Sequence, residues 1–333
     1  MVLGLAAGSL LVECGARARY GVPLRERMPI LAIEAHPTRG FAMVPEQEHY
    51  TYLHRARTNT LGLRGEELAP RSSERVRVLL LGDSLIYGQG VADADTVPRL
   101  LEDAAGEQGR ALEAVNGGVR AYATHQELAL LEELGPTIDP DLVVVCWYWN
   151  DIEERDVAAT HTRLLASGPV PFDTGAPMRG RVWWRWRVLQ VLRASALLME
   201  FHDRLKARDA MPPDAAAVDA AFVRLGGYLD RLAIWCEERG ATLALAVMPE
   251  AQLATGATHP AAVLQNRALE LARSKGIPAL DLGPAIHAAT ARLGRLPVLA
   301  YDGHYDPAGN RALAYGLYEF LEASPGLLPR PAK

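Results

Sequence analysis

Cysteine is scarce in this sequence, and the few cysteines lie far apart. The 333 residues include three, at Cys14, Cys146 and Cys236. Three cysteines cannot form the disulfide framework that holds small secreted domains together. None of them belongs to a CxxC pair, so the sequence gives no support for a zinc site built on cysteine. We therefore expect neither a disulfide scaffold nor a structural metal.

A surplus of basic residues is also absent. Lys and Arg number 35 against 40 Asp and Glu, which gives a formal net charge of −5 at pH 7. Proteins that bind nucleic acid through its phosphates usually carry a basic surplus, so we expect no nucleic-acid partner. Hydrophobic residues make up 49% of the chain and charged residues 23%. These values are typical of a globular protein and exclude a largely disordered chain.

The N-terminal segment is apolar but short. Residues 1–12 carry no charged side chain, whereas a membrane-spanning helix needs about 20 apolar residues. The segment also lacks the basic start of a signal peptide. Two interpretations stay open: a packed helical turn, or the end of a signal or membrane anchor. The compartment is therefore undecided between the cytoplasm and export or anchoring, the latter with membrane association through the N-terminus.

From residue 76 onward, short apolar runs alternate with amphipathic helical patterns. The runs predict buried parallel strands at Val76–Leu81, Leu112–Val115, Leu142–Trp147, Thr242–Met248 and Ile277–Leu282. The predicted helices are Val97–Ala105, His125–Leu134, Val218–Arg239, Ala261–Lys275 and Pro307–Leu321. This alternation predicts an α/β fold: a three-layer α/β/α sandwich on a roughly five-stranded parallel sheet, flavodoxin-like in outline.

Two segments depart from this alternation. Residues 1–75 form a leader, which from residue 20 is rich in Pro, Arg and Glu without periodicity, so we predict irregular structure there. Residues 152–215 are an insertion in the main domain, residues 76–325. The insertion has three tryptophans among arginines, followed by a predicted helix Val188–Leu205. The favoured interpretation is that the rings cover an exposed face of the sheet; a substrate-binding lid and a membrane-surface helix stay open.

Polar residues gather where the predicted strands end. Gly82-Asp83-Ser84-Leu85 directly follows the first strand, where a tight turn can present a serine beside backbone N–H groups. Later strand ends are followed by the Asn-Gly-Gly loop 116–122, by Asn150 and by residues 301–309, which include an Asp/His pair. Chemistry in such sheets gathers at the carboxyl ends of the strands. These motifs are the parts of a serine acyl-transfer site: nucleophile, base, orienting acid and oxyanion donors.

Each motif also has a purely structural interpretation. Asp83 and Ser84 are residue types that commonly cap helices, and a lone loop histidine is most often an ordinary surface residue. For His304, the structural interpretation leaves the neighbouring residues unexplained. Among the nine histidines, His125 at the start of a predicted helix is the other candidate for a catalytic base.

Taken together and in this order, the motifs resemble those of the GDSL/SGNH hydrolase superfamily, named after its Ser, Gly, Asn and His. The resemblance covers residues 76–321 apart from the insertion. The leader sequence Asn59-Thr60-Leu61-Gly62-Leu63-Arg64-Gly65-Glu66 also resembles that of a bacterial subgroup whose members are often exported or anchored. The resemblance implies the SGNH hydrolase fold and a serine esterase without a cofactor.

The resemblance also implies a role for each motif residue. Ser84 is the nucleophile, His304 is the base that takes its proton, and Asp302 orients the imidazole. The N–H groups of Ser84 and Ala121, together with the Asn150 side chain, form the oxyanion hole.

The sequence departs from the family pattern at three positions. Ala121 stands where the family usually has glycine, and a β-carbon restricts positive φ, so Gly118 is the alternative donor. Tyr148 replaces the glycine of the usual GxND motif. We expect its ring to narrow the substrate pocket; the alternative is that it packs under the insertion. Asp302 precedes His304 by two residues instead of three, which leaves Asp306 open as the orienting acid.

Asp83 and Asp151 lie beside these motifs, and paired carboxylates raise the question of a metal. We expect Asp83 to fix the nucleophile turn and Asp151 to fix the loop that carries Asn150, with no bound metal. The predicted function is hydrolysis of a small acyl ester on a carbohydrate or another small polar molecule. A polysaccharide O-acyltransferase with the same site and a non-catalytic carbohydrate-binding relative stay open. The intact set of catalytic residue types argues against the latter.

Overall fold

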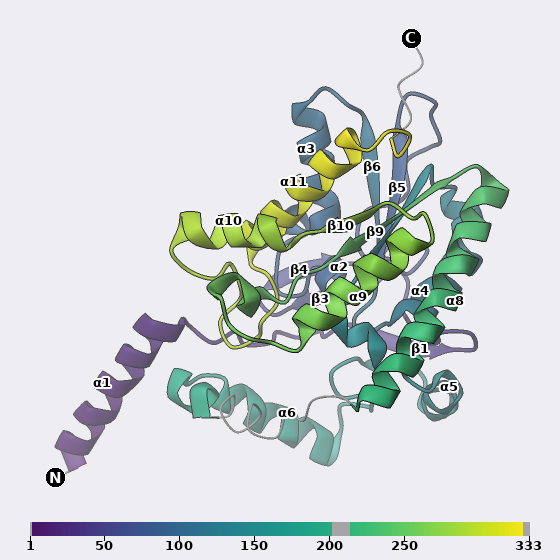
Figure 1. Ribbon diagram of the computed structural model, residues 1–333. Coiled ribbons are helices and arrows are strands. Elements are labelled where there is room, and N and C mark those ends of the chain that lie inside the picture. Colours follow the sequence, from purple (N-terminus) through teal and green to yellow (C-terminus); the bar gives the residue numbers. More distant parts are fainter. Residues whose placement is uncertain (1, 202–213, 329–333) are drawn as a thin grey trace.

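A five-stranded parallel sheet lies at the centre of the computed structural model, which describes residues 2–201 and 214–328 (Figure 1). The strand order is β10-β9-β7-β5-β6, and every neighbouring pair is parallel. The strands are β5 (Val76–Gly82), β6 (Leu112–Gly118), β7 (Leu142–Trp147), β9 (Thr242–Val247) and β10 (Ala279–Asp281).

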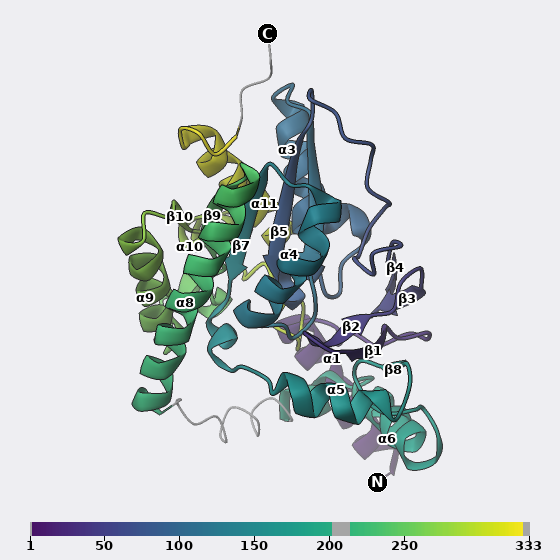
Figure 2. The same ribbon diagram turned by 90° about the vertical axis from the view of Figure 1, so that its right-hand side faces the viewer.

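Helices cover both faces of this sheet (Figure 2). One apolar core joins it to α4 (Thr124–Ile138), α8 (Ala215–Arg239) and α9 (Ala261–Ser274). The other joins it to α3 (Val97–Glu107), α10 (Gly283–Leu293) and α11 (Pro307–Ala323). Successive side chains of a strand point to opposite faces, so Leu79 enters the first core and Leu80 the second. The predicted α/β/α sandwich is confirmed.

The leader is not irregular, and that prediction is wrong. It contains β1 (Ala32–His36), β2 (Gly40–Met43), β3 (Glu48–Thr51) and β4 (His54–Arg57). The first two strands form one antiparallel pair and the last two form another. Strands this short show no clear period in the sequence. They are stabilised by tertiary packing, since leader side chains such as Leu31 and Phe41 are buried in the first core.

The insertion packs on the leader. Its short strand β8 (Val170–Pro171) pairs with β1, and α5 (Val157–Leu165) lies against β1 and β2. The predicted helix boundaries are wrong: α6 (Gly180–Leu192) begins before the three tryptophans and ends early. Helical structure resumes at residues 196–201, and the predicted end at Leu205 lies outside the described residues.

The tryptophans of α6 do not cover the sheet, which corrects the favoured interpretation. Trp183 and Trp184 are exposed, and the ring nitrogen of Trp186 donates to Glu26 of the leader at 2.9 Å. A helix that packs on polar leader residues cannot place these rings over the sheet.

The N-terminal segment forms a longer helix than the predicted turn. Figure 1 shows α1 (Val2–Tyr20) projecting away from the sheet. Its side chains Glu13 and Arg17 contact residues 194–197 of the insertion. Within the described residues, no helix is both long enough and apolar enough to span a membrane.

Candidate active site

Ser84 lies where β5 ends and a single helical turn begins. It is the first residue of α2 (Ser84–Tyr87), and the Asp83 carboxylate caps this helix by accepting the Leu85 N–H at 2.8 Å. The three residues after Ser84 are buried, whereas Ser84 stays partly exposed. An N–H at the start of a helix has no partner inside the helix. The turn therefore presents both the hydroxyl and the N–H of Ser84 at the carboxyl edge of the sheet.

His304 and Asp302 meet Ser84 from the loop before α11. His304 Nε2 lies 2.8 Å from Ser84 Oγ, and its Nδ1 is hydrogen-bonded to Asp302 Oδ1. Burial by itself raises the pKa of Asp302, but the hydrogen bond and charge of His304, with the Tyr52 hydroxyl, lower it to about 2. An ionised carboxylate only accepts hydrogen bonds. His304 Nδ1 therefore carries the proton, and Nε2 is free to accept the proton of Ser84.

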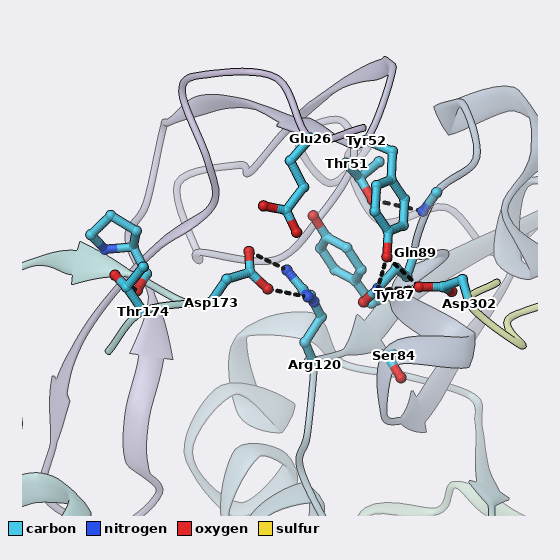
Figure 3. Close-up of polar contacts among 12 residues, drawn as sticks. Glu26, Thr51, Tyr52, Ser84, Tyr87, Gln89, Arg120, Asp173, Thr174 and Asp302 are labelled. Carbon is cyan, nitrogen blue, oxygen red and sulfur yellow. Dashed lines mark hydrogen bonds and ion pairs between the residues drawn. The ribbon is translucent and has the colours of Figure 1, made fainter. Parts of the chain in front are cut away.

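Leader and nucleophile-turn residues hold the other oxygen of Asp302. The Tyr52 hydroxyl donates to Asp302 Oδ2, and Gln89 Nε2 lies 3.4 Å from the same oxygen (Figure 3). Burial and the neighbouring Asp302 charge raise the pKa of Tyr52, so it remains a donor. Neither residue belongs to the motifs in the sequence. Tyr52 is separated from Asp302 by most of the chain, and no local pattern links the two.

Asp306, the alternative partner of His304, makes different contacts. It is the N-cap of α11, where Oδ1 accepts the N–H groups of Ala308 and Gly309 at 2.9 and 3.0 Å. Its Oδ2 accepts from Arg295 at 2.7 Å. These contacts occupy both oxygens with the helix start and a neighbouring arginine.

The three predicted oxyanion donors come from three successive strand ends. Asn150 lies in the turn η2 (Trp149–Ile152) after β7, and its Nδ2 donates to Asp83 Oδ2 at 3.2 Å. Ala121 follows β6 with φ of 62°, the left-handed conformation that glycine usually supplies. The Val119 N–H donates to the Gly82 carbonyl at 3.0 Å, which ties this loop to the end of β5. Among the described residues, no acceptor takes the N–H of Ser84 or Ala121.

Gly118 and Tyr148 are both engaged by other groups. The Gly118 N–H donates to the Asn116 side chain at 3.0 Å. A Cβ on Gly118 would lie 2.2 Å from the Tyr87 nitrogen, so this position lets α2 approach β6. The Tyr148 hydroxyl donates to Glu250 Oε2 at 2.6 Å, and its ring packs against the second core. Its partners therefore come from the loop after β9 and not from the insertion.

The rival base His125 contacts other residues. Its ring lies 6.3 Å from that of Tyr228 on α8, measured between centroids. His304, and not His125, is hydrogen-bonded to Ser84.

Three carboxyl groups close to one another are buried at the nucleophile turn: Asp83, Glu127 and Asp151. Burial raises the pKa of each, and charge repulsion from the other two carboxylates adds to this for Asp151. Thr124 Oγ1 donates to Asp151 Oδ2 at 3.3 Å. Neither carboxyl oxygen of Glu127 has a hydrogen-bond partner among the described residues. The sequence motifs include the two aspartates but not Glu127.

The leader motif contributes Arg64 to the support of the nucleophile turn. The guanidinium is buried and donates to the carbonyl oxygens of Tyr87, Gly88 and Val91 at 2.9, 2.6 and 2.9 Å. The carbonyls at the end of a helix lack partners inside the helix, so Arg64 completes the hydrogen bonding of α2.

The insertion contacts two residues of the region around Ser84: Glu26 of the leader and Arg120 in the loop after β6. The Glu26 carboxylate accepts from Trp186, Gln190 and Arg193 at 2.9 to 3.1 Å. Arg120, next to Ala121, forms a two-pronged ion pair with Asp173 at 2.7 and 3.3 Å (Figure 3). Charged and polar side chains of the leader and insertion therefore lie on one side of Ser84 (Figure 3).

Comparisons with known proteins identify the family of the chain. A sequence model of the GDSL-like Lipase/Acylhydrolase family matches residues 80–312. No protein of curated function matches the chain.

Solved structures also resemble the chain. TesA is 15% identical with a TM-score of 0.44, over 74% of this chain and 98% of TesA. The psychrotrophic esterase EstA from Pseudoalteromonas sp. is 11% identical with a TM-score of 0.44, over 74% and 97%. The acetyl xylan esterase AlAXEase is 13% identical with a TM-score of 0.45, over 73% and 98%.

The family match extends over more than two thirds of the chain and includes the Ser84, Asn150 and His304 motifs. The resemblance inferred from those motifs is thereby confirmed. The chain belongs to the GDSL-like lipase/acylhydrolase family and is an ester-bond hydrolase.

Proposed function

We propose that this protein is a serine esterase that removes a small acyl group from a carbohydrate or another polar acceptor. The observation that carries the proposal is the hydrogen-bonded chain from Ser84 through His304 to Asp302, with 2.8 Å between Ser84 Oγ and His304 Nε2. A serine in contact with a base that a third group orients is the arrangement that activates an alcohol as a nucleophile.

The reaction begins when Ser84 Oγ attacks the ester carbonyl while His304 Nε2 takes the hydroxyl proton. Asp302 keeps the proton on Nδ1 and stabilises the imidazolium that forms. The carbonyl oxygen gains negative charge and is held by the N–H groups of Ser84 and Ala121 and by the Asn150 amide. Each such donor contributes about 3 kcal/mol to lowering the barrier.

His304 then donates its proton to the departing alkoxide, which leaves as the free alcohol, and the acyl group remains as an ester on Ser84. Water enters, His304 takes one of its protons, and the hydroxide attacks the acyl carbonyl. Ser84 recovers its proton from His304 as the carboxylic acid is released. His304 is thus base and acid in turn.

The surroundings of Ser84 support a polar acceptor. Tyr52, Gln89, Arg120 and Asp173 all lie in the region shown in Figure 3, and each carries hydrogen-bonding groups. Sites for polar ligands use a few such groups to fix orientation. A hydroxylated acceptor such as a sugar matches them better than a long hydrocarbon chain does.

A panel of p-nitrophenyl esters of increasing acyl length, run beside acetylated xylan and related glycans, tests this proposal. We expect the highest kcat/KM for acetyl or another short acyl group and release of acetate from a glycan. Turnover by Ser84→Ala should be lower on the order of 10³-fold or more. A clear preference for long acyl chains with no glycan deacetylation contradicts the proposed substrate. Acyl transfer to added glycan in place of acetate release identifies the protein as an O-acyltransferase.

A further inference from the structure

One side of α6 contacts the rest of the protein, and the other side is exposed. Trp186, Gln190 and Arg193 follow one another at helical spacing, and all three bind Glu26 beside the active site. At 100° per residue, Trp184 and Val191 lie on the opposite side. Trp184 is 64% exposed and Val191 is 65% exposed. One side of the helix is therefore anchored and the other is apolar and uncovered within the described residues.

The apolar side of α6 forms a continuous stripe of Trp184, Val188, Val191 and Leu192. All four side chains are exposed. Their spacing of four, three and one residues keeps them on one side of the helix. We call this stripe, with the arginines beside it, the outer face of α6.

Arginines border the stripe, and no acidic residue accompanies them. Arg185 and Arg187 lie about 100° to either side of the anchored face, and Arg181 lies within the stripe. All three are exposed. Residues 179–199 contain five arginines and no Asp or Glu. In a chain of net charge −5, this face is locally basic and apolar at once.

The exposed apolar surface continues beyond α6. Leu197, Leu198 and Phe201, just after this helix, are exposed. So are Leu10, Leu11 and Val12 on α1. Glu13 joins the two segments by accepting from Ser195 Oγ and the Ala196 N–H, both at 2.8 Å. Figures 1 and 2 show α1 and α6 at the same end of the molecule.

We propose that the outer face of α6, extended by α1 and residues 197–201, binds the surface of an anionic lipid bilayer. Tryptophan and aliphatic side chains flanked by arginines insert to the depth of the headgroups, where the guanidinium groups meet lipid phosphates. A second copy of the chain docked through the same face would bring like-charged arginines together. Anionic lipid supplies the complementary charge.

The proposal adds a location to the esterase activity but does not depend on it. The opposite side of α6 binds Glu26, which lies in the same region as Ser84 in Figure 3. This arrangement would place the active site at the membrane-facing end of the molecule. A bound enzyme would then act on esters displayed at or near the lipid surface.

Vesicle flotation of the full chain tests the proposal. We expect the protein to float with phosphatidylcholine vesicles that contain phosphatidylglycerol, and not with phosphatidylcholine alone. High salt should weaken the binding, because screening reduces attraction between charged groups. Two variants should each reduce binding about tenfold or more: Trp184→Ser with Val191→Ser, and Arg181→Gln with Arg185→Gln and Arg187→Gln.

The matched control is the double variant Val223→Ser with Val263→Ser. These two valines lie on α8 and α9 and are 77% and 65% exposed. The control should bind vesicles like the wild type. Hydrolysis of a soluble p-nitrophenyl ester should be unchanged in all variants, which shows that each has folded. The proposal is overturned by absent or equal binding to both vesicle types, or by variants that bind like the wild type. A wild-type dimer that Trp184→Ser with Val191→Ser makes monomeric overturns it too, because the occupant is then a second copy.

Discussion

At the scale of single residues, Asp302 orients the ring of His304 through its hydrogen bond to Nδ1. It is buried, yet its pKa is lowered to about 2, because contacts with His304 and the Tyr52 hydroxyl outweigh the effect of burial. The ordinary pKa of this carboxyl group is 3.8. Because its pKa in the folded protein is lower, ionised Asp302 stabilises the fold at pH values above 3.8. This stabilisation is lost as the pH falls from about 4 toward 2.

Replacing Asp302 and Asp306 by asparagine, one at a time, shows which of them orients His304. Asp302→Asn should lower kcat by on the order of 10³-fold or more, because an amide no longer fixes the tautomer of His304. Asp306→Asn should keep activity within a few-fold and cost less than about 1 kcal/mol, because asparagine also caps helices well. Ester hydrolysis and urea unfolding of both variants check this. If Asp306→Asn loses more activity than Asp302→Asn, Asp306 is the orienting acid.

Substitutions of Tyr148 show whether its ring borders the acyl group of the substrate. Tyr148→Gly should raise kcat/KM for hexanoyl relative to acetyl esters by about tenfold or more, since each added methylene discriminates by about 1–3 kcal/mol. Tyr148→Phe is the control, because it keeps the ring and removes the hydrogen bond to Glu250; the ratio should stay as in the wild type. An unchanged ratio in Tyr148→Gly shows that the ring does not border the acyl group.

At the scale of elements, the contact between α2 and β6 positions the nucleophile. Gly118 lies at the end of β6, opposite Gly82 at the end of β5. A Cβ there would meet two backbone atoms, Tyr87 N at 2.2 Å and Ile86 C at 2.6 Å. Backbone cannot rotate away as a long side chain can, so any substitution must move α2 and Ser84 with it.

Gly118→Ala should therefore cost about 1–3 kcal/mol of stability and lower kcat about tenfold or more, because small shifts of a nucleophile slow the reaction strongly. Gly106→Ala is the matched control: it lies on α3 with no atom within 4 Å of the added Cβ. It should raise stability by about 0.5–1 kcal/mol and leave kcat unchanged. Urea unfolding and initial rates measure both. Wild-type kcat in Gly118→Ala means that α2 tolerates the shift.

Elements differ in how far the sequence predicts them. β7 is buried on both faces and reads as a continuous apolar run, so its predicted bounds agree with the structure. β1 and β2 are short, and they pack against α5, which lies far along the chain. No local pattern carries that information.

The same distinction holds for the candidate site. Ser84 and Asn150 lie in local motifs directly after strands, and His304 lies in a local motif just before α11, so the sequence shows them. Tyr52 contacts Asp302, and Glu26 contacts Arg193, residues that are far apart in the sequence and meet only in the folded chain. Ala121 is visible in the sequence, but its φ of 62° appears only once the loop is folded.

At the scale of the whole molecule, the stability should depend on pH through the buried carboxyl groups. The pKa of Glu127 is raised well above its ordinary value of 4.5 by burial and by the charge of Asp83. The folded protein therefore holds this proton more tightly than the unfolded chain does. The free energy of unfolding then falls as the pH rises above 4.5 and toward the folded pKa.

Glu127→Gln should reduce this fall, because glutamine does not titrate. Between about pH 5 and pH 9, its free energy of unfolding should decline less than that of the wild type. Glu132→Gln, on the exposed side of the same helix, should track the wild type within about 0.5 kcal/mol. Urea unfolding at several pH values gives the comparison. Parallel curves for Glu127→Gln and the wild type contradict the assignment of a protonated Glu127.

Labelling with a fluorophosphonate probe shows whether Ser84 is the nucleophile of an ester hydrolase. We expect the probe to modify Ser84 in the wild type, as located by peptide mass spectrometry, and to abolish ester hydrolysis. Ser84→Ala should fold, take up no probe and lose turnover on the order of 10³-fold or more. Modification of a different serine, or a Ser84→Ala variant that keeps more than about a tenth of wild-type turnover, contradicts this role of Ser84.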